Sequence, residues 1–560
     1  MFFTLGVSAA TPEGCAALTD RALAVDPSVM PVPGPAGVAW RSPDGRAALL
    51  RWGAAAEQGP DEGTRAAGTS RAGTIWAGVP DSRGGSVPLC ARTSVTRVDP
   101  VYLAEVPGAA VIADRAAWAA WTSSRLDNHD SLHLCALLNP GFPLGSVTPF
   151  TGVSAVAGST TLRLLNGSVT RARGAAERAA SLTEPRHNGA AASGQAPRVE
   201  GARDVAQGLV AAVASLRDAG SPVELSLTGG KDSRLIAAAL VKAGVPVVAR
   251  THGFGDHPDV VVAAEIARRL GIEHVVRTPA APGQRVDVLA RIRATVLVAD
   301  GMLSAFENVG RPDPAASPAL TAGGHGGELL RGGYAETSGR VAATSGARRA
   351  VAPARRAARS AELLRRLTTK HLGLIRRGPA AAYAASLAPW TPRLARHPMQ
   401  ALDDFYLVNR AGRWSAAARQ AYLLRERLVQ PLFDDRVVLA ARAVPLADRV
   451  SGALSAAVLS ELSPALADVP LAGKPPAGTG SPFDWRRQYG DAVTTFLRGY
   501  ILDLGTTSTL FDVVSRPAAE RLLTPPHADR ATVWALATAA CLVSGDYRRA
   551  REPTHQLPVG

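Results

Sequence analysis

The chain has 560 residues, more than one hydrophobic core usually supports, so we expect two or more domains. Apolar residues make up 46% of the chain, yet no uninterrupted apolar stretch approaches the ~20 residues of a membrane span, so we expect no membrane association. The net charge of +15 is compatible with acidic substrates. No compact basic tract carries interleaved aromatic residues, and we therefore expect no nucleic-acid partner.

The first residues, "MFFTLGVSAATPEG", lack a basic segment before an apolar core, so we expect no signal peptide and a cytoplasmic location. The cysteines are scattered without a CxxC spacing, at Cys15, Cys90, Cys135 and Cys541. This pattern argues against a zinc site or a disulfide framework and favours buried thiols.

Residues up to about Val169 form short apolar stretches broken by Gly, Pro, Asp and Ser, as in residues 37–52 and 108–121. Such a pattern predicts strands and turns with a few helices. Residues 184–197, "EPRHNGAAASGQAP", are small and polar with two prolines, and they predict an inter-domain linker.

Beyond the linker, helical and strand patterns alternate. The helix "ARDVAQGLVAAVASLRDAG" precedes a strand "VELSL", a helix "DSRLIAAALVKAG", a strand "VPVVAR", a helix "PDVVVAAEIARRLG" and a strand "EHVV". This order predicts a parallel sheet covered by helices on both faces. After Ala280 the pattern is mostly helical, including residues 357–367 and 416–428, and residues 533–543 predict a buried helix.

The stretch "SLTGGKDSR", residues 226–234, follows the first of these strands. A Walker A loop would need a hydroxyl residue directly after the lysine, but Asp232 follows Lys231, so that interpretation fails. Glycines between a parallel strand and a helix N-terminus still predict an anion site, because backbone N–H groups and the helix dipole converge there. An ordinary tight strand-to-helix turn is the alternative, and the loop alone does not decide between them.

Four segments in order resemble the ATP-pyrophosphatase group that includes the asparagine synthetases. "LTGGKDS" resembles their S-G-G-x-D-S pyrophosphate loop, and residues 252–274 resemble the segment after their second strand. "GGHGGELLRGGY", residues 323–334, resembles their G-E-G-A-D-E-L-F-G-G-Y loop, and residues 430–445 resemble a fourth motif, V-P-F-L-D-x-x-x-V-x-x-A-x-x-x-P. The resemblance implies ATP and Mg²⁺ as ligands. It implies an ATP-binding set consisting of Leu227, Thr228, Gly229, Gly230, Lys231, Asp232, Ser233, Arg234, His252 and Gly326.

The resemblance also implies a fold and its boundaries. Residues 1–183 would form a degenerate class II glutamine amidotransferase-like α+β domain, residues 184–198 a linker, and residues 199–560 a parallel-sheet ATP-pyrophosphatase domain with a helical extension. The family's N-terminal nucleophile is a cysteine after Met1, and this chain has Phe2 there. We therefore expect no glutaminase activity and an amine that comes from the substrate itself.

Relatives with the same loss, the beta-lactam and carbapenam synthetases and the lasso peptide cyclases, form amide bonds intramolecularly after adenylating a carboxylate. By position, the resemblance makes His325 a catalytic base, Asp232 and Glu328 magnesium ligands, and Lys474 the cation that stabilises charge as the amine attacks. A histidine that only hydrogen-bonds in its loop and a surface lysine remain the alternatives. Glu426 would be a second catalytic carboxylate or a solvated helix residue. The chain has only four lysines, which makes Lys474 informative.

One further departure concerns the family's T-K-x-x-L-R segment. Residues 453–462, "ALSAAVLSEL", stand in its place and lack the lysine, so Lys231 or Arg234 would have to compensate at the pyrophosphate.

Among these relatives, residues 130–153 and 405–414 look most like lasso peptide cyclases. The implied reaction adenylates an Asp or Glu side chain of a precursor peptide, and the peptide's N-terminal amine closes a macrolactam, releasing AMP and pyrophosphate. A leader peptidase and a leader-recognition protein would be partners. A small-molecule amide or beta-lactam synthetase and a catalytically silent nucleotide-binding protein remain the alternatives.

Overall fold

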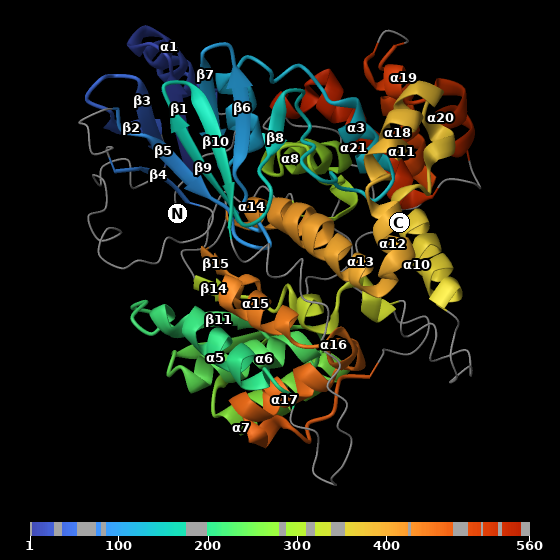
Figure 1. The fold of residues 1–560 in the computed structure, drawn as a ribbon. Helices are drawn as coiled ribbons and strands as arrows, with labels where there is room; N and C mark the ends of the chain where they lie inside the picture. Colours follow the sequence, from blue (N-terminus) through green and yellow to red (C-terminus); the bar gives the residue numbers. More distant parts are fainter. Residues whose placement is uncertain are drawn as a thin grey trace.

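The computed structural model of the chain (Figure 1) describes twelve stretches of the sequence and one single residue. These are residues 3–26, 36–52, 74–79, 86–174, 199–278, 287–307, 309, 320–337, 353–423, 427–473, 491–505, 508–524 and 529–549. The predicted linker at 184–197 and the predicted catalytic residues Glu426 and Lys474 lie outside these described residues.

The N-terminal part of the chain forms two antiparallel sheets. The six-stranded sheet has the order β2-β3-β1-β7-β6-β8, with bounds Ala36–Arg41, Ala47–Trp52, Phe3–Ala9, Ala109–Ala113, Tyr102–Val106 and Val153–Ala155. The four-stranded sheet has the order β10-β9-β5-β4, with bounds Ser168–Arg173, Thr160–Leu165, Leu89–Arg92 and Thr74–Ala77. Strand alternation directs Leu49, Leu103 and Ile112 of the first sheet and Leu162 and Leu164 of the second into a shared apolar layer.

The opposite face of the six-stranded sheet packs on helices α1 (Pro12–Leu23) and α2 (Ala116–Thr122). Trp118 of α2 is fully buried in this layer, together with Leu5 and Val7 of β1. These strands, turns and few helices agree with the pattern predicted for the first third of the chain.

A five-stranded parallel sheet follows, with the order β13-β12-β11-β14-β15. Its strands are Glu273–Arg277, Val247–His252, Val223–Ser226, Leu320–Ala322 and Arg427–Val429. Its helices include α5 (Ala202–Val213), α6 (Lys231–Lys242), α7 (Pro258–Leu270), α15 (Asp435–Ala443) and α17 (Ala453–Leu462), which surround the sheet in the lower half of Figure 1. Antiparallel sheets at the N-terminus and a parallel sheet after them confirm a mixed α/β fold.

Two strands of the parallel sheet were missed by the sequence analysis. The prediction of a helix through residue 428 is wrong at its end, because α14 spans Ala416–Leu423 and residues 427–429 form β15. Leu320–Ala322 of β14 pairs in parallel with β11 on one side and with β15 on the other. Three-residue strands are too short to show a period of two, so tertiary pairing decides their structure.

Most of the remaining helices lie at the centre and right of Figure 1, and residues from them share one apolar cluster with the six-stranded N-terminal sheet. They include α3 (Ser131–Leu138), α8 (Val288–Val298), α10 (Pro353–Thr368), α11 (Arg377–Leu387), α12 (Trp390–Arg396), α13 (Pro398–Phe405), the π-helix η6 (Tyr406–Ser415), α18 (Asp491–Leu502) and α21 (Arg530–Ser544). The largest apolar cluster joins Leu5 of β1 and Trp118 of α2 to Leu297 of α8 and Leu536 of α21. One core therefore extends across the predicted linker.

Helix α21 is the buried helix predicted at residues 533–543, and all its residues from Thr532 to Leu542 are buried. Cys15, Cys135 and Cys541 are buried thiols as predicted, whereas Cys90 is only half-buried. Within the described ranges, no group of three or more His, Cys, Asp or Glu side chains is arranged to hold a metal ion. No described helix combines the length and the apolarity that crossing a bilayer requires.

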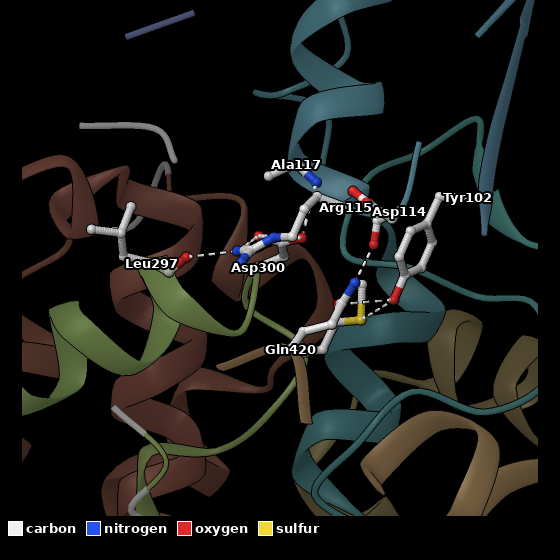
Figure 2. Close-up of polar contacts among 8 residues, drawn as sticks. Tyr102, Asp114, Arg115, Ala117, Leu297, Asp300 and Gln420 are labelled. Carbon is white, nitrogen blue, oxygen red and sulfur yellow. Dashed lines mark hydrogen bonds and ion pairs between the residues drawn. The ribbon is translucent and has the colours of Figure 1, made fainter. Parts of the chain in front are cut away.

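A buried ion pair also joins the N-terminal sheets to the later helices (Figure 2). The Arg115 guanidinium, at the start of α2, donates to the Asp300 carboxylate and to the Leu297 carbonyl oxygen. The side chains of Arg115 and Asp300 are 0% and 1% exposed, so neither charge is compensated by water. Beside them, Gln420 donates to the Asp114 carbonyl oxygen, and the Tyr102 hydroxyl lies 3.4 Å from the Met302 sulfur.

Candidate active site

The first glycine loop connects the carboxyl end of β11 to α6. Ser226 ends the strand, and α6 begins at Lys231 with Gly230 as its N-cap. No side chain caps this helix end, so its first-turn N–H groups and its dipole are left to stabilise a ligand anion. Because β11 lies between β12 and β14, the loop stands where chain connections leave the sheet in opposite directions, the usual position of a ligand crevice.

Ser233 and Thr228 hold this loop closed. The Ser233 hydroxyl accepts a hydrogen bond from the Thr228 backbone N–H at 3.1 Å and lies 3.1 Å from the Thr228 hydroxyl. The Thr228 hydroxyl in turn accepts from the Gly230 N–H at 3.2 Å. Ser233 is 6% exposed, so its first effect is on the loop conformation, which positions the N–H groups for an anion.

Arg234 and Asp259 support the loop from the protein side. The buried Arg234 guanidinium donates to the carbonyl oxygens of Gly229, Gly230, Val469 and Pro470. These four bonds direct the guanidinium toward backbone oxygens of the protein. Asp259 of α7 accepts from the Gly229 N–H at 3.0 Å, a contact that the sequence analysis missed because 30 residues separate the partners.

The second glycine loop, Gly323–Gly326, follows β14 and packs directly on the first. A Cβ atom on Gly324 would lie 2.8 Å from the Ser233 backbone nitrogen, and one on Gly327 would lie 2.0 Å from the Asp232 carboxyl carbon. Gly326 has a φ of +99°, a left-handed conformation that glycine adopts without strain. In this chain the contact between the two loops therefore requires glycine at 324 and 327, although the family motif quoted above has alanine at the position of Gly327.

Asp232 forms an ion pair with Arg331 of the 3₁₀ helix η4 (Gly327–Arg331), and Arg331 also donates to Glu336 at 3.1 Å. Burial raises the pKa of Asp232, the Arg331 charge opposes this effect, and Glu328 raises the pKa further. The sequence motif contains Arg331, but the ion pair spans 99 residues and could not be read from it.

His325 and Glu328 lie at the same place. His325 is exposed at the loop surface, and desolvation by the surrounding protein lowers its pKa, with Glu328 and Asp232 acting in the opposite direction. The imidazole is therefore neutral at pH 7, the form that can accept a proton. The structure thus brings together three of the residues predicted for the chemistry: Asp232, His325 and Glu328.

Four other predicted residues surround the loops. Leu227 is fully buried beneath the first loop, His252 is exposed at the carboxyl end of β12, Lys231 is half-buried at the start of α6, and Gly326 turns the second loop. The Ala472 N–H donates to the Gly229 carbonyl oxygen at 3.1 Å, so the described chain runs against the first loop just before Lys474.

The Asp232 and Glu328 carboxylates fit a magnesium–nucleotide complex. Mg²⁺ in nucleotide sites typically takes one or two protein carboxylates together with phosphate oxygens and water. Glu328 follows Gly327, where a Cβ atom would lie 2.0 Å from the Asp232 carboxyl carbon, so the two acidic residues lie next to each other at the uncapped α6 N-terminus. Either carboxylate could supply oxygen ligands. When it binds the metal, the Asp232 carboxylate would give up part of its contact with Arg331.

A cavity of about 370 Å³ opens next to Glu328. It is lined by Glu328 of η4 and residues of the segment 333–337, by α10 and the α13–η6 junction, and by the loop that follows α3. Glu328, Tyr334, Tyr406, Phe142 and Arg410 are among its lining residues. The cavity therefore lies between η4, which follows the second glycine loop, and the N-terminal part of the chain.

Comparison with known proteins agrees with this geometry. The family model described as asparagine synthase matches residues 204–463, which contain the parallel sheet and both glycine loops. No curated protein gave a significant match. Residues 204–463 are thus an asparagine synthase domain, of the class found in ATP-dependent amide-forming ligases.

Proposed function

We propose that the protein adenylates a carboxylate with ATP and then forms an amide bond, releasing AMP and pyrophosphate. One observation carries the proposal: two glycine loops from neighbouring strands of the asparagine synthase domain meet at Asp232. The first loop offers backbone N–H groups to phosphate, and the second brings His325 and Glu328 to the same point. Such convergence would place a nucleotide and a proton acceptor beside each other.

In this mechanism the α6 N-terminus, the first loop and Lys231 bind the phosphates of ATP. Asp232 and Glu328 would hold Mg²⁺, and the bound ion would supply positive charge that offsets the charge of pyrophosphate. Neutral His325 accepts the proton from the attacking amine, and Lys474 stabilises the charge of the tetrahedral intermediate. The hydrogen bond from Ala472 to Gly229 supports this role for Lys474, because it brings the preceding chain to the loop.

We further propose that the reaction is intramolecular and that the substrate is a ribosomal precursor peptide. Its N-terminal amine would attack an adenylated Asp or Glu side chain and close a macrolactam. A leader peptidase and a leader-recognition protein would act with the enzyme. Phe2 in the first domain supports an amine that comes from the substrate.

A small-molecule amide synthetase is the second candidate, and the cavity size favours it. A volume of about 370 Å³ is near the lower end of the roughly 300–1,000 Å³ range of ligand pockets. It could enclose a small substrate completely, but only the end of a peptide.

The two candidates differ in which substrate yields a cyclised product. The protein is incubated with ATP, Mg²⁺ and either a peptide encoded next to its gene or a panel of small amino acids, and AMP, pyrophosphate and product mass are measured. A peptide that loses one water with equimolar AMP supports the macrolactam reaction, whereas acetylation of its N-terminus should stop ring closure. AMP formation with small acids alone would favour the second candidate, and no AMP with any substrate would contradict both. Asp232→Asn serves as the inactive control.

A further inference from the structure

The positive charge of the chain is concentrated in one stretch of the sequence. Residues 340–396 contain 13 of the 62 Lys and Arg residues but only one of the 47 Asp and Glu residues, Glu362. This stretch therefore carries +12 of the net charge of +15, and all other residues together carry +3. A general preference for arginine would not also remove the acidic residues from one segment, so the distribution requires a local explanation.

The described part of this stretch includes helices α10 and α12, which lie side by side at the right of Figure 1. Leu364 of α10 and Leu394 of α12 belong to the same apolar cluster, so the inner sides of both helices are fixed to the core. Their arginines point away from that cluster into solvent. We call the exposed cations of these two helices the basic face, which consists of Arg355, Arg359, Arg393 and Arg396.

The basic face has no acidic partner of its own. Glu362, the one carboxylate on the two helices, accepts hydrogen bonds from Arg365 and Arg366 instead. Among the described residues, no carboxylate forms an ion pair with any of the four cations. Arg355 and Arg359 stand four residues apart on one side of α10, where like charges destabilise a helix, and Arg355 lies near the helix N-terminus, whose dipole disfavours a cation. Charges that weaken their own helix indicate a role in binding an anionic partner.

Helix α10 also connects the basic face with the cavity beside Glu328. Leu367 and Thr368, at the end of α10, are among the residues that line this cavity. Arg359 and Arg355 precede Leu367 by 8 and 12 residues, which is about 12 and 18 Å along the helix axis. An extended peptide covers this distance with about four to six residues. A peptide whose end lies in the cavity can therefore reach both cations.

The residues around the cations favour a polypeptide over a nucleic acid. Proteins that bind single-stranded nucleic acids combine cations with aromatic rings on which the bases stack. On α10 and α12 the exposed neighbours of the arginines include Ala358, Ala361 and Ala395, and the one aromatic residue, Trp390, is half-buried beneath Arg393. Peptide carboxylates need no stacking surface, because a guanidinium binds them through its parallel N–H donors.

We propose that the basic face binds an acidic segment of the peptide substrate and thereby holds the peptide with its end in the cavity. The inference rests on the proposed function and specifies its substrate class: a peptide that carries Asp or Glu residues about four to six positions from the group in the cavity. Because the four cations are exposed, their attraction for carboxylates is electrostatic and weakens as salt screens the charges.

The test measures binding to the full chain, so it does not depend on turnover. Three fluorescein-labelled probes of equal length are titrated by fluorescence anisotropy at about 0.02 M and about 0.15 M salt. They are a peptide of six glutamates, a peptide of six glutamines and an oligothymidylate of six nucleotides. The native chain is compared with two double variants, one with Arg355→Gln and Arg359→Gln on α10 and one with Arg393→Gln and Arg396→Gln on α12.

A third double variant, Arg41→Gln with Arg163→Gln, is the matched control. It removes the same charge from exposed positions on β2 and β9 of the N-terminal sheets. We expect the native chain to bind the glutamate peptide more tightly than the glutamine peptide and to lose this preference as salt is added. Each basic-face variant should weaken binding of the glutamate peptide about three- to tenfold, and the control should change it less than about twofold.

Several results would overturn the inference: no binding of the glutamate peptide, equal binding of the two peptides, or the same loss in the control as in the basic-face variants. Tighter binding of the oligothymidylate, lost in the same variants, would assign the basic face to a nucleic acid instead. If the glutamate preference fails while AMP forms with a substrate, only the docking surface is wrong. If the preference holds while no AMP forms with any substrate, the proposed function fails and the basic face remains a site for acidic polypeptides.

Discussion

Asp232 and Arg331 form an ion pair that joins the segments after the two glycine loops, since Asp232 lies in the first turn of α6 and Arg331 ends η4. The two side chains are 23% and 10% exposed, so the pair is shielded from solvent. Arg331 is held from its other side by Glu336. A change at Asp232 therefore affects ligand binding while Arg331 keeps one carboxylate partner.

We predict that Asp232→Asn abolishes ATP-dependent AMP release while the chain stays folded. The amide keeps the shape of the carboxylate but loses the charge proposed to hold Mg²⁺. Pyrophosphate exchange and near-ultraviolet circular dichroism, measured on the same sample, check both parts. Normal exchange by the folded variant would remove Asp232 from the nucleotide site.

We expect Gly327→Ala to disrupt the contact between the loops. The new Cβ would lie 2.0 Å from the Asp232 carboxyl carbon, so one loop has to move, at a cost of about 1–3 kcal/mol in the free energy of unfolding. ATP affinity from calorimetry should fall with it. Gly378→Ala is the control, because a Cβ there meets no atom within 4 Å. Equal ATP affinity in the two variants would show that loop contact does not set nucleotide binding.

The pH dependence of the rate should report His325. A base acts in its deprotonated form, so activity is lost as the pH falls through its pKa, and desolvation places that pKa below the usual value of ~6.5. The acidic limb of kcat should therefore lie below pH 6.5. His325→Gln should lower kcat by roughly 10²–10⁴ and remove this limb. An unchanged limb in the variant would assign it to another group.

Lys474 gives a prediction that separates adenylation from amide formation. If its ammonium stabilises the tetrahedral intermediate, Lys474→Ala should lower amide formation by about 10²–10³ while substrate-dependent pyrophosphate exchange continues. Lys474→Arg should rescue poorly, because a planar fork does not replace a compact charge. Exchange and product mass are measured side by side. Equal loss of both would move the lysine to ATP binding.

Asp300→Asn tests the buried pair at Arg115. Removing the carboxylate leaves a buried guanidinium uncompensated, and we expect a loss of about 3–5 kcal/mol in the free energy of unfolding. Asparagine tolerates the φ of +51° at this position, so the charge is the main change. Glu105→Gln is the control, since its pair with Arg171 has both side chains 52% exposed and should contribute less than ~1 kcal/mol. Denaturant unfolding of both variants measures the difference.

The sequence predicted those parts of the fold that have a clear local signal. Helices α6 and α7 end near Gly244 and Gly271, and both glycines have positive φ, as a helix-ending glycine should. The first glycine loop could be located because its residues are contiguous. The contacts of Asp232 with Arg331 and of Gly229 with Asp259 could not be predicted from the sequence, because they depend on how distant strands pair in the sheet. The cavity needs Phe142 from before the predicted linker and Arg410 from after it, so no local pattern reveals it.

The apolar cluster that joins β1 and α2 to α8 and α21 has a consequence for dissecting the protein. A chain cut near residue 190 would leave Leu5 and Trp118 in one fragment and Leu297 and Leu536 in the other, and each fragment would expose the surface that the other covers. Such fragments should aggregate when expressed separately and regain solubility when expressed together. Loss of the N-terminal residues would thus remove one side of this apolar cluster. Helices α8 and α21 would then have no other surface in the cluster to replace β1 and α2.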